Sequence, residues 1–225
     1  MSTVREDFER SFWMLVEDSL LLIEASELNP GTELANSLAR AALLNTLVLP
    51  EVVANCCIDD LRLESSVYKE VDRLSVIAKF DFYLRTKFRN KSISRGDRHV
   101  QSIGELKKLR DDYVHPKSRR VRWIGDPDGE QTAERPLTPI LGIAKNPRDW
   151  WHEDAVLAMR ATHGFLAHFF KERCRYSRVA VASIVACECE SPVRGDYYVP
   201  YLPRRLKSNL EHWEINLDYV KHGWL

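Results

Sequence analysis

The arginine and histidine five positions apart, Arg110 and His115, carry the clearest chemical signal in the sequence. They lie in the stretch KKLRDDYVHPKSRR, residues 107–120, where a helical pattern meets a proline. An arginine fork grips a phosphate in two places and keeps its charge at every working pH. An imidazole takes up or releases a proton near neutral pH. Together, the two side chains have the chemistry to bind an RNA phosphodiester and move the proton of the adjacent 2′-hydroxyl without a metal.

The proline explains how these two side chains can meet. On a continuous helix, a residue five positions on is rotated by about 140° from the first, so the two side chains would point apart. Pro116 disfavours the helical conformation at the residue before it. The sequence therefore predicts that the helix ends near Tyr113 or Val114, and that His115 folds back to share a site with Arg110.

The motif also resembles a known family. Arg110, the polar Asp111 and His115, in LRDDYVHPK, resemble the R-x4-6-H motif of the HEPN superfamily. The stretches NSLARAALLNTLVLPEVVANCCIDDL and VIAKFDFYL resemble the helices that precede this motif in many members. The resemblance spans about residues 7–175 and is interrupted by residues 117–149. RLKSNLEH, from Arg205 to His212, is a second match to the spacing, and context favours the first match, which lies in the basic segment and ends a strongly periodic helix.

The resemblance implies an up-and-down helical bundle that forms a homodimer, with two motifs facing each other in one cleft. Many members are metal-independent endoribonucleases of toxin, antiphage defence or RNA-processing systems, and they leave a cyclic phosphate. It also implies catalytic roles for Arg110 and His115, a supporting polar role for Asp111, and an antitoxin or another protein as a possible partner. The family often has asparagine where this chain has Asp111, and Asp111 and Asp112 add negative charge beside the expected phosphate.

The charge distribution points to the same segment. Net charge is zero overall, but residues 1–84 hold 7 Lys and Arg against 15 Asp and Glu, and residues 85–122 hold 13 against 4. Such a basic segment either attracts phosphate or pairs with the acidic first third of the chain. On the first interpretation, the cations expected to bind the RNA backbone are Lys107, Lys108, Lys117, Arg119 and Arg120.

The periodicity of apolar residues predicts a mainly α fold. Helices are expected at residues 7–28, 33–62, 67–88, 99–113 and about 150–174, with Pro50 either kinking the second or dividing it into two. Asn-Pro-Gly is expected to end the first helix, and Thr32 is expected to cap the second. The side chains expected on one side of the fourth helix are Val100, Ile103, Leu106, Leu109 and Tyr113, and Trp150 and Trp151 are expected to be core anchors. The stretches VRWIG and VAVASIVAC are candidate short strands. The expected organisation is a helical bundle over residues 1–175, with an irregular or short-strand insertion at 117–149, and a mixed C-terminal extension at 176–225 with a possible short strand.

Several other functions find no support in the sequence. The N-terminus lacks the order of a signal peptide, and no apolar run approaches the ~20 residues that span a bilayer, so a cytoplasmic protein without membrane contact is expected. The five cysteines suggest reduced thiols. No HExxH, CxxC pair, phosphate loop or dinucleotide fingerprint occurs, so neither a metal nor another cofactor is expected. His163 and His168 are expected to be core or surface residues rather than ligands.

Three functions therefore remain open. The first is a dimeric, metal-independent endoribonuclease with His115 as general acid or base and Arg110 on the phosphate. The second is a non-catalytic HEPN-like module that binds RNA, a nucleotide or a protein partner. The third is a scaffold bundle whose basic segment pairs with its acidic first 84 residues.

Overall fold

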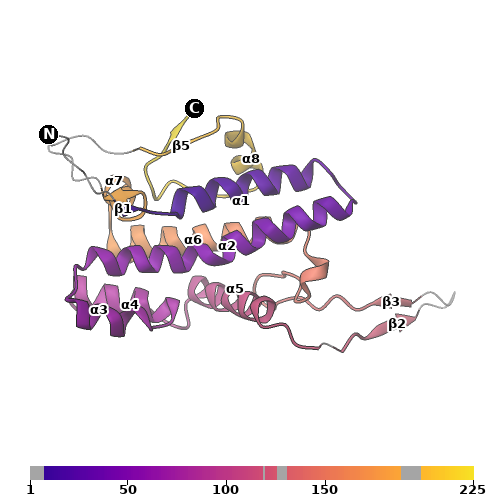
Figure 1. Cartoon of the computed structure of the whole chain (residues 1–225), viewed down its shortest axis with the longest axis horizontal. Helices are drawn as coiled ribbons and strands as arrows, with labels where there is room; N and C mark the ends of the chain where they lie inside the picture. The colour runs from indigo at the N-terminus through magenta and orange to yellow at the C-terminus, as the bar shows by residue number, and fades with distance from the viewer. Residues whose placement is uncertain (1–7, 119, 126–130, 189–198) are drawn as a thin grey trace, which may run out of the picture.

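The computed structural model describes residues 8–118, 120–125, 131–188 and 199–225, and these ranges are mainly helical, as predicted (Figure 1). The α-helices are α1 (Phe12–Glu27), α2 (Glu33–Asp60), α3 (Ser65–Asp72), α4 (Val76–Lys87), α5 (Arg98–Val114), α6 (His152–Ala167), α7 (Arg178–Val185) and α8 (Leu206–His212). A 3-10 turn, η1 (Pro147–Asp149), precedes α6, and a π-helical segment, η2 (His168–Cys174), continues it. The strands are β1 (Phe8–Glu9), β2 (Trp123–Gly125), β3 (Gln131–Ala133), β4 (Cys187–Glu188), β5 (Tyr201–Leu202) and β6 (Gly223–Trp224).

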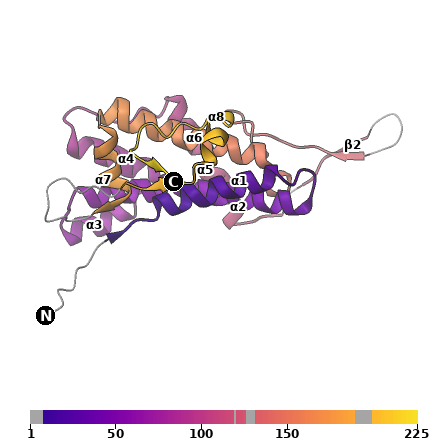
Figure 2. The same ribbon diagram turned by 90° about the horizontal axis from the view of Figure 1, so that it is seen from above.

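Helices α1 and α2 form an antiparallel pair joined by a tight turn (Figures 1 and 2). The predicted stop at Asn-Pro-Gly is confirmed, and Gly31 takes the left-handed conformation with φ +73° that favours glycine. Thr32 then caps α2, because its hydroxyl oxygen accepts a hydrogen bond from the Ala35 N–H at 3.0 Å. The predicted start of the first helix at residue 7 is wrong: α1 begins at Phe12, and the chain before it pairs as β1 with β4.

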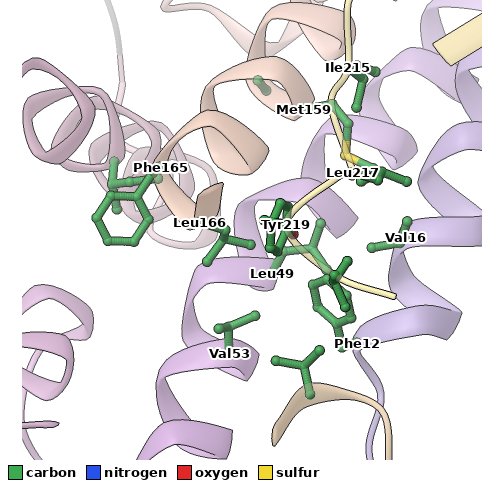
Figure 3. Packing of buried hydrophobic residues seen from close by; sticks show 14 of the residues in the cluster. Phe12, Val16, Leu49, Val53, Met159, Phe165, Leu166, Ile215, Leu217 and Tyr219 are labelled. Carbon is green, nitrogen blue, oxygen red and sulfur yellow. The ribbon is translucent and has the colours of Figure 1, made fainter. Parts of the chain in front are cut away.

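Helix α2 is the centre of the core and runs through Pro50 as one helix rather than two. It packs against α1, α4 and α6. Pro50 has no backbone N–H, so one helical hydrogen bond is missing there. Leu49 and Val53, on either side of Pro50, are completely buried, and their packing holds the helix together at this point. Figure 3 shows both side chains facing Phe12 of α1 and Leu166 of α6 in one cluster.

The predicted helix at residues 67–88 is wrong as a single element, because the chain breaks it into α3 and α4. Ser75 is extended, with φ −65° and ψ 156°. Lys79 is buried just after this break, and its ammonium donates to Asp72 at 2.9 Å and to Asn55 at 2.7 Å. The apolar spacing continues across the break, so periodicity gave no sign of it.

The C-terminal region also departs from the prediction. The apolar stretch expected as a strand is helix α7 up to Val185, and only Cys187–Glu188 pairs as strand β4. Ser177 caps α7 by accepting a hydrogen bond from the Ala180 N–H at 3.2 Å. Short apolar runs do not distinguish a strand from a buried helix, and here the cap decides it.

The described end of the C-terminal extension, residues 199–225, belongs to the same core as the bundle. Ile215, Leu217 and Tyr219 reach the cluster formed by α1, α2 and α6 (Figure 3). Tyr219 is completely buried, and its ring stacks on Phe170 at 6.2 Å between ring centroids. These residues therefore stabilise the bundle directly.

The insertion at 117–149 contains the predicted short strand. Strands β2 and β3 pair antiparallel, with Trp123 opposite Ala133, and their hairpin projects from one end of the bundle (Figures 1 and 2). The same end carries the α1–α2 turn, η1 and the start of α6. Residues 126–130 of this insertion lie outside the described ranges.

Among the described residues, helix α2 is long and apolar enough, by length and composition, to cross a bilayer. The sequence-based expectation, by contrast, is that no apolar run in the chain approaches that length. Of its apolar window, 61% is buried inside the fold. The core helix of a soluble protein passes the same test, so the feature is weak evidence for a membrane span.

Candidate functional site

Helix α5 positions the motif and ends where the sequence predicts. Asp97 caps its start by accepting a hydrogen bond from the His99 N–H at 2.8 Å. Val114 is the last helical residue, and His115 has φ −117° and ψ 66°, outside the helical region. The His115 backbone N–H still donates to the Asp111 carbonyl oxygen at 3.0 Å, which fastens this residue to the last turn.

The guanidinium of Arg110 is held by two carboxylates. It donates to Glu51 of α2 and to Asp111 Oδ1, at 3.1 Å from Nη2 and 3.3 Å from Nε. The Arg110 side chain is 24% exposed, so part of the guanidinium remains open to solvent. The contact with Glu51 directs the Arg110 side chain toward α2. Together with Asp111, it gives the guanidinium two anionic neighbours.

Asp111 bridges two cations on the same helix. It accepts a hydrogen bond from Lys107, four residues earlier, as well as from Arg110. These bonds, the one from Lys107 first, hold the pKa of Asp111 below its usual range. Asp111 is therefore an anion beside Arg110, and the supporting position expected from the sequence is occupied by a charged group.

The structure brings Arg110 and Asp111 together, and it joins neither to the His115 side chain. His115 is exposed, and its imidazole makes no hydrogen bond or ion pair with the described residues. The expected sharing of one site by Arg110 and His115 is thus not present as a direct contact. A bound phosphodiester would have to connect them and compete with Glu51 for the guanidinium.

The predicted RNA-binding cations fall into two groups. Lys108, Lys117 and Arg120 are exposed and have no ion-pair partner in the described part of the chain. Lys107 is bound to Asp111, and Arg119 lies outside the described residues. Free positive charge therefore gathers around the end of α5 and the segment after it.

Part of the basic segment does pair with the acidic first third, as the second interpretation of the charge pattern expects. Lys87 contacts Asp60 at 3.0 Å, and Arg110 contacts Glu51. Both pairs join a helix of the basic segment to α2. This pairing is incomplete: among the described residues Lys108, Lys117 and Arg120 have no ion-pair partner, whereas Arg122 lies 4.0 Å from Glu134.

An aromatic contact ties the motif to the start of α6. The ring of Tyr113, two residues before His115, stacks on Trp150 with 5.8 Å between ring centroids and 21° between planes. Trp150 is completely buried, and its indole N–H donates to the Ala144 carbonyl oxygen at 2.6 Å. Trp150 is thus a core anchor, as predicted, and it also supports the end of α5. The same prediction for Trp151 is wrong, because its side chain is 36% exposed.

Glu51 is the site residue that sequence reasoning missed. It follows Pro50 in an apolar helix and lies 59 positions before its partner Arg110. A single carboxylate on a helix usually faces solvent, so its presence in the sequence indicates no partner. No spacing pattern in the sequence relates Glu51 to α5. Only the packing of α2 against α5 shows the pair.

The other candidate nucleophiles and ligands have structural partners. Burial raises the pKa of the Cys174 thiol to about 12 and raises the pKa of Cys57 well above its usual value, so both remain protonated. His163 is a core residue bonded to the Tyr219 hydroxyl at 2.7 Å, and His168 lies 3.1 Å from Asp97. No group of three or more His, Cys, Asp or Glu side chains in the described ranges is arranged to hold a metal ion.

Comparison with known proteins returned no matching family model, no matching curated protein and no matching solved structure.

Proposed function

We propose that this chain is a metal-independent endoribonuclease resembling the HEPN superfamily. The observation that carries the proposal is the end of α5: an exposed, unengaged His115 directly follows the helical turn that presents a partly open Arg110. Lys108, Lys117 and Arg120, which flank the motif in the sequence, have no ion-pair partner among the described residues. The end of α5 therefore combines a general acid or base with a phosphate-binding group, and nearby cations supply electrostatic attraction.

The proposed reaction is a transesterification within RNA. The 2′-oxygen attacks the adjacent phosphorus, and the bond to the 5′-oxygen of the next nucleotide breaks. The products are a 2′,3′-cyclic phosphate and a 5′-hydroxyl. The 2′-hydroxyl loses a proton and the 5′-oxygen gains one, and His115 serves one of these transfers while Arg110 stabilises the phosphate charge. In a homodimer, a second His115 supplies the other transfer.

The direct test is cleavage of single-stranded RNA by the purified full-length chain in excess EDTA. We expect shorter products that carry a cyclic phosphate and a 5′-hydroxyl. RNA that stays intact at high protein concentration, with the chain folded and at its native oligomeric state, would contradict the proposal. Sedimentation at the assay concentration tests the homodimer separately.

A non-catalytic RNA-binding module is the second candidate, and the ion pairs of Arg110 favour it. Glu51 and Asp111 already occupy this guanidinium, so a phosphate has to displace or share it. In such a module, the exposed cations after α5 bind the RNA backbone, and the affinity falls steeply with salt. Binding without any cleavage, unchanged by His115→Ala, distinguishes this candidate from the enzyme.

Glu51→Gln separates a phosphate-binding Arg110 from a purely structural one. The substitution removes one of the two carboxylate charges that contact the Arg110 guanidinium, and it keeps the shape of the Glu51 side chain. If Arg110 binds phosphate, we expect affinity for single-stranded RNA to rise severalfold, measured by fluorescence anisotropy at fixed salt. Stability should fall by at most about 1 kcal/mol, because the pair is partly exposed.

Glu70→Gln is the matched control, since it removes an exposed carboxylate whose one ion pair among the described residues is with Arg73, the C-cap of the same helix α3. It should leave RNA affinity almost unchanged. Equal affinities for wild type, Glu51→Gln and Glu70→Gln would show that Arg110 is a structural residue.

A further inference from the structure

A pocket of about 580 Å³ lies where α1 turns into α2 and α6 begins. This volume is within the range of about 300–1,000 Å³ that is usual for small-molecule sites. Its apolar lining includes Pro30, Ala35 and Leu157, and its polar lining includes Arg135 and Glu153. None of these residues belongs to the motif at the end of α5.

Arg135 is the fixed donor of the pocket. Its Nη2 donates to Asp154 Oδ2 at 2.6 Å and to the Asp149 carbonyl oxygen at 3.0 Å. The Asp154 side chain is only 3% exposed, and its carboxylate also accepts the N–H groups of Ala144 at 2.9 Å and Trp151 at 3.0 Å. Both oxygens of Asp154 are therefore occupied, by Arg135 and by two backbone N–H groups, while the Arg135 side chain itself remains 46% exposed. The rest of the guanidinium is available to a ligand.

An acceptor and an aromatic ring complete the lining. Glu153 is 69% exposed, and of its two oxygens only Oε2 is near another polar group among the described residues, at 3.4 Å from His152 Nδ1. Trp151 is 36% exposed although it follows the buried Trp150. A large aromatic residue that stays partly exposed in a pocket offers a flat face to a ligand.

The charges exclude a simple phosphate site. Arg135 is balanced by Asp154, and Glu153 adds a further negative charge. A neutral, planar ligand with both donors and acceptors on its edge fits these groups better than an anion does. We propose that this pocket binds a nucleobase, stacked on Trp151, with Arg135 donating to a base acceptor and Glu153 accepting from a base N–H.

This proposal deepens the proposed function and rests on it for the source of the base, which would be an unpaired nucleotide of the RNA substrate. The pocket lies next to the residues that support the motif: Tyr113 of α5 stacks on Trp150, and the following residue, Trp151, lines the pocket. A base held here would fix the register of the strand relative to His115. Single-stranded RNA is commonly recognised by such stacked, splayed-out bases.

The test titrates adenosine, guanosine, cytidine and uridine into the full-length chain by isothermal titration calorimetry. We expect at least one nucleoside to bind, and Trp151→Leu to weaken it about tenfold or more, as loss of a stacking ring does. Trp123→Leu is the matched control, because Trp123 is 60% exposed on the hairpin and does not line the pocket. It should leave nucleoside affinity unchanged. Glu153→Gln, an exposed substitution that preserves the fold, should change the order of preference among the four nucleosides.

Three results would overturn the pocket assignment. They are absence of nucleoside binding at millimolar concentration, competition by ribose 5-phosphate as strong as that by nucleosides, and equal affinities in wild type, Trp151→Leu and Glu153→Gln. Circular dichroism and melting curves of each variant confirm that the fold is retained. If Trp151→Leu unfolds, the Glu153→Gln preference alone decides.

The outcome is separable from that of the proposed function, because nucleosides contain no bond to cleave. Nucleoside binding should survive His115→Ala, and RNA cleavage is measured independently of nucleoside affinity. A 2′-O-methyl RNA oligonucleotide identifies the source of the base. Tighter binding of the oligonucleotide than of its best nucleoside supports an RNA base, whereas equal or weaker binding overturns the link to RNA and leaves a free nucleoside or nucleotide as the ligand.

Discussion

His115→Ala should lower the rate of RNA cleavage about 10²- to 10⁴-fold, the usual contribution of a positioned general acid or base. His115 follows the last helical residue of α5, is exposed, and makes no side-chain hydrogen bond with the described residues. Its removal should therefore have little effect on the folded structure. The rate is measured under single-turnover conditions in excess EDTA, with circular dichroism to verify the fold.

His212→Ala is the matched control for this prediction. His212 ends the other stretch of the chain with similar spacing, from Arg205 to His212, and its side chain is 74% exposed. Its replacement should leave the rate unchanged. If His115→Ala cleaves as fast as wild type, His115 has no catalytic role, and the non-catalytic module becomes the better description. If both variants lose activity equally, the loss is not specific to the motif.

Acidification should destabilise the fold through His163, with a loss of about 4 kcal/mol by pH 3. His163 is completely buried, and burial lowers its pKa from 6.5 to about 3. Its Nδ1 lies 2.7 Å from the Tyr219 hydroxyl, and its Nε2 has no hydrogen-bond partner among the described residues. The folded state therefore favours the neutral imidazole.

The direction of the effect follows from proton binding. Below about pH 6.5, the unfolded chain binds a proton at this histidine and the folded chain does not, so the free energy of unfolding falls as the pH decreases. The contribution is fully present above pH 6.5 and is lost progressively down to the folded pKa of about 3. At pH 5, the expected loss from this residue is about 2 kcal/mol.

Urea unfolding at pH 7.5 and pH 5 measures this loss. His163→Gln should flatten the dependence between these two pH values, because it removes the titrating group, although it lowers stability at both. His212→Gln, the same change at an exposed histidine, controls for the loss of an imidazole as such. A wild-type slope that persists in His163→Gln would assign the acid sensitivity to other residues.

Local signals in the sequence predicted several elements correctly. Asn-Pro-Gly ends α1, Thr32 caps α2, and the proline after His115 ends α5 at Val114. These features depend on backbone geometry within a few residues, which the amino-acid types determine directly. The apolar spacing of α5 likewise placed Val100, Ile103, Leu106 and Leu109 in the core, whereas Tyr113 of the same row is 39% exposed.

Errors arose where one local pattern suits two structures. The apolar spacing of residues 67–88 is compatible with one helix, yet the buried Lys79 needs Asp72 and Asn55 as partners, and the break after α3 provides that arrangement. The stretch that became α7 is equally compatible with a strand, and the Ser177 cap favours the helix.

For the candidate site, the sequence by itself determined the residue types, their spacing on α5 and the reason that the helix stops. It also located the excess of positive charge in one segment. Only the tertiary structure decided that Glu51 of α2 holds Arg110 and that the His115 imidazole makes no hydrogen bond or ion pair with the described residues. It also decided that Trp151 and Arg135 line a common pocket. These contacts join residues far apart in the chain, and side-chain packing between helices, rather than any local propensity, determines which of them meet.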